Sequence, residues 1–144
     1  MMTTKASKFL ALSSTDRRLI VQAWVFQMAA GFLLKAVPFR AIPRFFRNPV
    51  TAAGEGTVTG VNPELLSSIR SALIRTSPYV WWRNRCLVQS LAARWILKKR
   101  GIMSHLYLGL AKDADKKTVA HAWIKVGENE IVSKNGNYVE LFDF

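Results

Sequence analysis

One cysteine in this chain has the surroundings that nucleophilic catalysis requires. Cys86 is the only cysteine among the 144 residues, and it follows an aromatic loop at the expected start of a helix, with Arg83 and Arg85 beside it. A helix N-terminus and neighbouring cations stabilise a thiolate, which is the nucleophilic form of cysteine. The alternative interpretation is a small buried hydrophobic side chain, since most free cysteines have that role.

A histidine that could serve this cysteine as a base lies further along the chain. His121 stands in the segment VAHAWIKV (119–126), whose alternation predicts a strand. The more apolar face of that strand is expected to join the core, and it holds Ala120, Ala122, Ile124 and Val126. His121 shares the opposite face with Trp123, where it is either a structural histidine or a base for a thiol. His105 is a weaker candidate, because it begins a strand directly after a helix end.

Other chemistries lack the residues they need. One cysteine and two separated histidines do not make a zinc site, and a single thiol excludes an internal disulfide framework. The sequence has no phosphate-binding glycine motif and no GxSxG motif. We therefore expect no metal and no cofactor. An apolar fraction of 50% also excludes a disordered chain.

Three regions must position these side chains. Residues 1–47 are predicted to be helical: Ser13 or Ser14 can cap a helix that starts near Thr15, and Val37-Pro38 ends it. A second short helix is expected around 41–46. Residues 48–62 have the Gly, Thr and Ala content of a flexible loop, and residues 63–144 are predicted to form the core domain.

The spacing of apolar residues changes along the core domain, from a helical period to a period of two. Asn62 and Pro63 begin a helix, Ser77-Pro78 ends it, and a second helix is predicted from Cys86 to about Lys99, with Gly101 as its C-terminal glycine. A two-residue period then predicts strands at 105–111, 118–126, 130–133 and 138–142. Helices followed by an antiparallel meander predict an α+β fold.

The charge is concentrated in the first three quarters of the chain. The formal net charge is +12, and residues 1–110 hold 16 of the 21 basic residues but three of the nine acidic ones. Such a basic surface attracts acidic peptides, anionic membranes or nucleic acid. The run Leu19–Leu34 is uncharged but shorter than the roughly 20 residues of a membrane span. We expect a buried or partner-facing helix there, with Phe45 and Phe46 in a docking face; membrane-surface contact is the alternative.

Four segments together resemble the leader-peptidase B proteins of lasso-peptide biosynthesis, a transglutaminase-like group. The resemblance covers about residues 9–144, and its order and spacing are more specific than any single motif. The segments are FLALSSTDRRLIVQAWVFQMAAGFLLKAVPFRAIPRFF (9–46), RCLVQSLAARWILKKRGI (85–102), LYLGLAK (106–112) and AHAWIKV (120–126).

The resemblance implies a function and a fold. The fold would be a transglutaminase/papain-like core, with the cysteine-bearing helix packed on a small antiparallel sheet. The protein would be a cytoplasmic or membrane-associated cysteine peptidase that removes the leader from a ribosomal precursor, with Cys86 as nucleophile and His121 as base. Its partners would be the precursor leader, a separate small recognition protein and a lasso cyclase, and not nucleic acid. A peptide-binding scaffold without turnover, or a basic membrane-surface protein, is the alternative.

The third catalytic residue departs from the family pattern. The resemblance implies an acidic residue about a dozen positions after the histidine, but the corresponding stretch here is IVSKNG (131–136), which has no acid. Asn135 is a substitute that can orient a histidine. Ser133 is the alternative, and Asp143 lies too near the C-terminus to be preferred.

Overall fold

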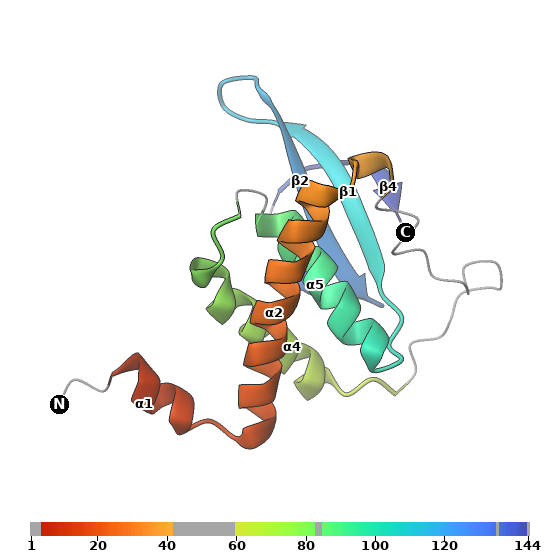
Figure 1. Cartoon of the computed structure of the whole chain (residues 1–144). Helices are drawn as coiled ribbons and strands as arrows, with labels where there is room; N and C mark the ends of the chain where they lie inside the picture. Colours follow the sequence, from red (N-terminus) through yellow and green to blue (C-terminus); the bar gives the residue numbers. More distant parts are fainter. Residues whose placement is uncertain (1–3, 42–59, 83–84, 135, 144) are drawn as a thin grey trace.

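The fold is an α+β arrangement in which a helical layer covers a four-stranded sheet, as predicted. The computed structural model describes residues 4–41, 60–82, 85–134 and 136–143. The helices are α1 (Lys5–Leu10), α2 (Ser14–Ala36), the short 3-10 helix η1 (Phe39–Ala41), α4 (Pro63–Thr76), the 3-10 helix η2 (Ser77–Tyr79) and α5 (Arg85–Lys99). The strands are β1 (His105–Lys112), β2 (Thr118–Val126), β3 (Asn129–Val132) and β4 (Val139–Asp143) (Figure 1).

Local signals set the ends of the long helices. The side chain of Ser13 accepts a hydrogen bond from the backbone N–H of Asp16 at 3.1 Å, which caps α2. The side chain of Asn62 accepts from the N–H of Glu64 at 2.9 Å and caps α4. Both caps were expected from the sequence, but no separate helix was specified at the position of α1 within the predicted helical region 1–47. Gly101 follows α5 with a φ of +69°, a conformation that glycine adopts without steric cost.

The sheet presents His121 at its centre. Its strand order is β3-β2-β1-β4, and all neighbours are antiparallel. The first three strands form the predicted meander, and β4 returns to the free edge of β1. In the β1–β2 register, His121 lies opposite Gly109 and Trp123 lies opposite Tyr107.

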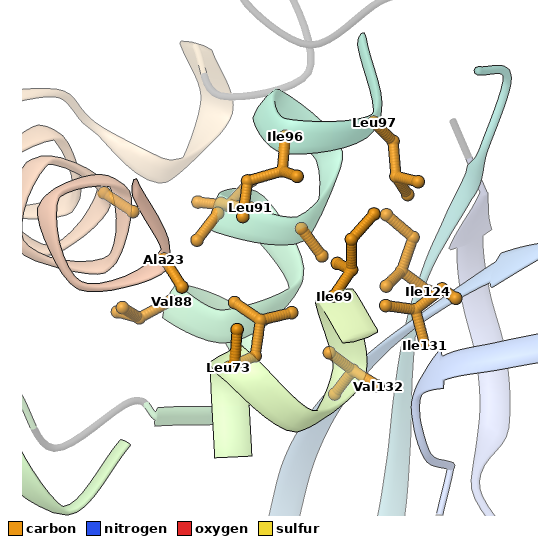
Figure 2. Packing of buried hydrophobic residues seen from close by; sticks show 14 of the residues in the cluster. Ala23, Ile69, Leu73, Val88, Leu91, Ile96, Leu97, Ile124, Ile131 and Val132 are labelled. Atoms are coloured by element: carbon orange, nitrogen blue, oxygen red, sulfur yellow. The ribbon is translucent and has the colours of Figure 1, made fainter. Parts of the chain in front are cut away.

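The hydrophobic core is centred on α5, between the helices α2 and α4 and the sheet. Helices α2 and α4 pack against α5, which also contacts β2 and β3. Figure 2 shows side chains from all of these elements meeting: Ala23, Ile69, Leu73, Val88, Leu91, Ile96, Leu97, Ile124, Ile131 and Val132. The predicted core face of β2 is buried at Ala122, Ile124 and Val126, whereas Ala120, near the start of the strand, is exposed. Because α5 is covered on several sides, it carries buried residues all around rather than along one stripe.

Helix α2 belongs to this same core. It buries Leu19, Ala23, Gln27 and Met28, so residues before 47 share one hydrophobic cluster with residues after 63. The Nε2 of Gln27 donates to the hydroxyl of Thr76 in α4 at 2.6 Å. By length and composition alone, α2 is also long and apolar enough to cross a membrane, a property that core helices of globular proteins can share.

The outer side of α2 is more open than its apolar pattern suggests. The exposed fraction is 40% for Trp24 and 58% for Phe32, although both recur at the three- and four-residue spacing of the apolar residues in this segment. Several predicted features lie outside the described residues: nearly all of the helix expected around 41–46, with Phe45 and Phe46, most of the loop at 48–62, Arg83 and Asn135.

Candidate active site

Cys86 lies at the start of the central helix. It is the second residue of α5, half-buried, with a free thiol. The first four backbone N–H groups of a helix have no partner within the helix, so the N–H of Cys86 has none within α5 and can bind an oxygen that develops negative charge. The positive end of the helix dipole lies at this end of α5, and Arg85, which is exposed, precedes Cys86 in the chain.

His121 is held in one orientation by the backbone of the next strand. Its Nε2 lies 2.8 Å from the carbonyl oxygen of Ser133. A carbonyl can only accept a hydrogen bond, so Nε2 must carry the proton. The neutral imidazole then has its lone pair on Nδ1, and that nitrogen is the one that can take a proton from a thiol.

Two aromatic rings fix the plane of the imidazole. The ring of Tyr138 stacks on it with centroids 4.8 Å apart and an interplanar angle of 28°. Trp123 lies on the same face of β2, 6.1 Å away and tilted by 19°. Together with the hydrogen bond to Ser133, these contacts leave the His121 ring little freedom to rotate.

The aromatic cluster depends on a glycine. Trp123 is fully buried even though it lies on the face that the sequence predicted to be less apolar. A Cβ on Gly109 would lie 2.9 Å from its indole and 2.8 Å from the carbonyl oxygen of Val139. Glycine at this position therefore lets the indole and strand β4 approach β1. On the solvent side, the Lys134 ammonium lies 4.9 Å from the Trp123 ring centre.

Cys86 and His121 line the same cavity. It has a volume of about 260 Å³ and is bounded by α4, the first turn of α5, β2 and β3. Ile74 is 57% exposed and lines this cavity, although it is a large apolar residue next to the buried Leu73 in α4. Gln89, one turn after Cys86, also lines it and offers an amide to a substrate. We call this cavity the Cys86 cleft.

The group that orients His121 differs from the side chains considered from the sequence. The hydroxyl of Ser133 does not bond the imidazole; it accepts a hydrogen bond from Arg70 at 3.2 Å, while the carbonyl of the same residue holds the ring. Asn135 lies outside the described residues, as does the side chain of Asp143. No acidic residue is among the described residues that line the cleft.

The remaining candidates lie elsewhere. His105 is exposed and stands 6.4 Å from the Tyr107 ring, and it does not line the Cys86 cleft. Among the residues that the structure describes, no three His, Cys, Asp or Glu side chains gather as metal ligands. The sequence reasoning missed Tyr138, Arg70 and Gln89; only alternation in β2, which pairs His121 with Trp123, pointed to an aromatic neighbour.

A cysteine at a helix start and a strand histidine line one cleft of this α+β fold, which places a thiol and a potential base in the same cavity. A sequence model described as the transglutaminase-like superfamily matches residues 24–142. The chain therefore belongs to the transglutaminase-like superfamily, which includes cysteine peptidases. No curated protein and no solved structure matches it.

Proposed function

We propose that this protein is a cysteine peptidase that removes the leader from a ribosomally made precursor during lasso-peptide maturation. The thiolate of Cys86 attacks the carbonyl carbon at the end of the leader. Nδ1 of His121 accepts the thiol proton and later delivers it to the amine of the core peptide, which leaves. Water then hydrolyses the thioester, releasing the leader carboxylate and restoring the thiol.

The observation that carries this proposal is the common cleft of Cys86 and His121. The hydrogen bond from Nε2 to the Ser133 carbonyl supports the base role, because it leaves Nδ1 unprotonated. The backbone carbonyl stabilises the imidazolium that forms during the reaction less strongly than a carboxylate would. We therefore expect the same reaction type with a lower rate than in enzymes that have an acidic third residue.

Leader removal, rather than another thiol reaction, follows from the resemblance of the four segments to lasso-peptide leader peptidases. The net charge of +12 suits an acidic leader or a recognition partner. The proposal places the reaction in the cytoplasm, where ribosomal precursors are made. Its further partners are a small leader-recognition protein and the cyclase that uses the released core peptide.

The test is cleavage of a candidate precursor, with and without a recognition protein, read by mass spectrometry. We expect one cut at the end of the leader, lost in Cys86→Ala and in His121→Ala. His105→Ala is the matched control, because it removes the other histidine, which is exposed and outside the cleft. Full processing by Cys86→Ala would contradict the peptidase assignment and favour a peptide-binding scaffold.

A further inference from the structure

A second and larger concave site lies on the other side of α4 from the Cys86 cleft. The cavity measures about 880 Å³, within the range of ligand-binding pockets, and lies between α1, α2 and the end of α4. Arg75 and Thr76 of α4 line this groove, whereas Leu73 and Ile74 line the cleft. The apolar part of the groove consists of Phe9, Leu12, Ile20, Val21, Trp24 and Tyr79. We call it the α1–α2 groove.

The sequence of the first helix builds one wall of this groove. Lys5, Lys8, Phe9 and Leu12 follow helical spacing, so α1 and the turn after it present them on one face. The Lys5 ammonium lies 5.6 Å from the ring centre of Tyr79, a contact that connects α1 to η2. Trp24 on the opposite wall is 40% exposed, so its indole is available to an occupant.

The charged residues that line the groove itself have one sign, although Asp16 lines a neighbouring hollow that shares Leu12, Ile20 and Arg75 with it. Lys5, Lys8 and Arg75 stand among its lining residues, and none of the described lining residues is acidic. Arg17 and Arg18 line an adjoining hollow that shares Phe9 and Val21 with the groove. An apolar floor with a cationic rim is complementary to a segment that carries apolar side chains on one side and carboxylates on the other.

We propose that the α1–α2 groove binds an acidic amphipathic segment of the peptide substrate, separate from the residues that are cut. This inference rests on the proposed peptidase function. The groove and the cleft are both lined by the last turn of α4, through Arg75 and Thr76 on the one hand and Leu73 and Ile74 on the other, so one substrate chain that passes around the end of α4 can occupy both sites. Anchoring the substrate in the groove raises the concentration of its scissile bond at the cleft. A concave site between helices fits a peptide segment better than a flat bilayer.

Binding can be measured without turnover. The probe is a fluorescein-labelled, 16-residue helical peptide of Leu and Glu in amphipathic spacing, titrated by anisotropy against Cys86→Ala protein. The same peptide with Lys in place of Glu is the control ligand. The test variant adds Lys8→Glu and Arg75→Glu; the control adds Lys112→Glu and Lys116→Glu, which change the net charge equally on the β1–β2 hairpin. A third variant, Trp24→Ala, tests the apolar wall.

We expect the acidic peptide to bind and the Lys peptide not to bind. Reversing Lys8 and Arg75 should weaken binding by roughly tenfold or more, Trp24→Ala should weaken it as well, and the hairpin control should change it little. Thermal melts verify that each variant is folded. Equal weakening by the hairpin control, or no saturable binding at all, overturns the proposal.

Two further experiments distinguish this proposal from membrane binding and from failure of the peptidase function. Sedimentation with anionic phosphatidylglycerol vesicles that depends on Lys8 and Arg75, without peptide binding, would assign the groove to a membrane and overturn the peptide site. If the precursor is cut, the Lys8→Glu, Arg75→Glu substitutions are also made in protein that keeps Cys86. This active variant should have a higher KM for the precursor and a kcat near its original value. Peptide binding that persists when no precursor is cut would retain the groove while rejecting the peptidase function.

Discussion

Adding one methyl group to α2 should disturb both stability and the approach to Cys86. A Cβ on Gly31 would lie 2.0 Å from Nε1 of Trp82 and 2.1 Å from its Cε2. Ordinary contacts begin near 3.4 Å, so the indole must move by at least about 1.4 Å. Trp82 has little room to do so, because it is 8% exposed, meets Phe32 edge to face at 5.1 Å and lies under Lys35.

The expected stability change is the difference of two opposing effects. Overpacking a filled site costs about 1–3 kcal/mol, and the displacement places this case toward the upper end. Replacing a helical glycine by alanine returns up to about 1 kcal/mol through helix propensity. We expect Gly31→Ala to lower the free energy of unfolding by about 1–2 kcal/mol, which corresponds to a fall in Tm of roughly 3–8 °C for a chain of this size.

Activity should fall as well, because Trp82 lies four residues before Cys86. A misplacement near 1 Å can cost up to about a hundredfold in rate, and we expect a loss of roughly tenfold to a hundredfold in kcat/KM. Thermal denaturation by circular dichroism and the precursor cleavage assay measure the two effects. Trp82→Phe, alone and combined with Gly31→Ala, completes a double-mutant cycle, in which the smaller ring should relieve the clash. An increase in Tm with unchanged activity in Gly31→Ala would refute this reasoning.

Three other perturbations address different parts of the structure. Tyr138→Leu should lower kcat severalfold by freeing the His121 ring, whereas Tyr138→Phe should keep most of the activity and the same pH profile. Burial lowers the pKa of Arg94 to about 10, so its guanidinium stays charged at neutral pH and donates to the Ser104 carbonyl at 2.8 Å. Arg94→Met should destabilise the fold by about 1–3 kcal/mol in urea unfolding, equally at pH 6 and pH 8.5. Only above about pH 10 does the folded protein release this proton while the unfolded chain still keeps it. The free energy of unfolding of the wild type therefore rises there relative to that of Arg94→Met. Gln27→Leu should cost about 1–2 kcal/mol by chemical denaturation, because its buried partner hydroxyl in α4 loses a donor.

The elements that carry the candidate site were predictable because their signals are local. Asn62 before Pro63 marks the start of α4, and the two-residue period of 118–126 matches β2 at both ends. The burial of one β2 face followed from the same alternation. These features depend on residues within a few positions of each other, so a single sequence is sufficient to find them.

The surroundings of His121 were not predictable for the opposite reason. Tyr138 reaches the imidazole only because the chain after β3 returns toward β4 at the far edge of the sheet, a long-range arrangement that no local pattern encodes. The orienting group at Ser133 is a backbone carbonyl, and residue type carries no information about which carbonyl faces a ring. The close approach of Gly31 and Trp82 likewise joins residues that are far apart in the sequence.

The most direct test of the central claim is to trap the covalent intermediate. Precursor and enzyme are mixed, quenched in acid within the first turnover, and examined by intact mass and peptide mapping. We predict an enzyme species heavier by the acylated leader, attached as a thioester at Cys86, absent in Cys86→Ala and slow to form in His121→Ala. An acyl group on another residue, or undiminished leader removal by Cys86→Ala with no enzyme adduct, would contradict the account.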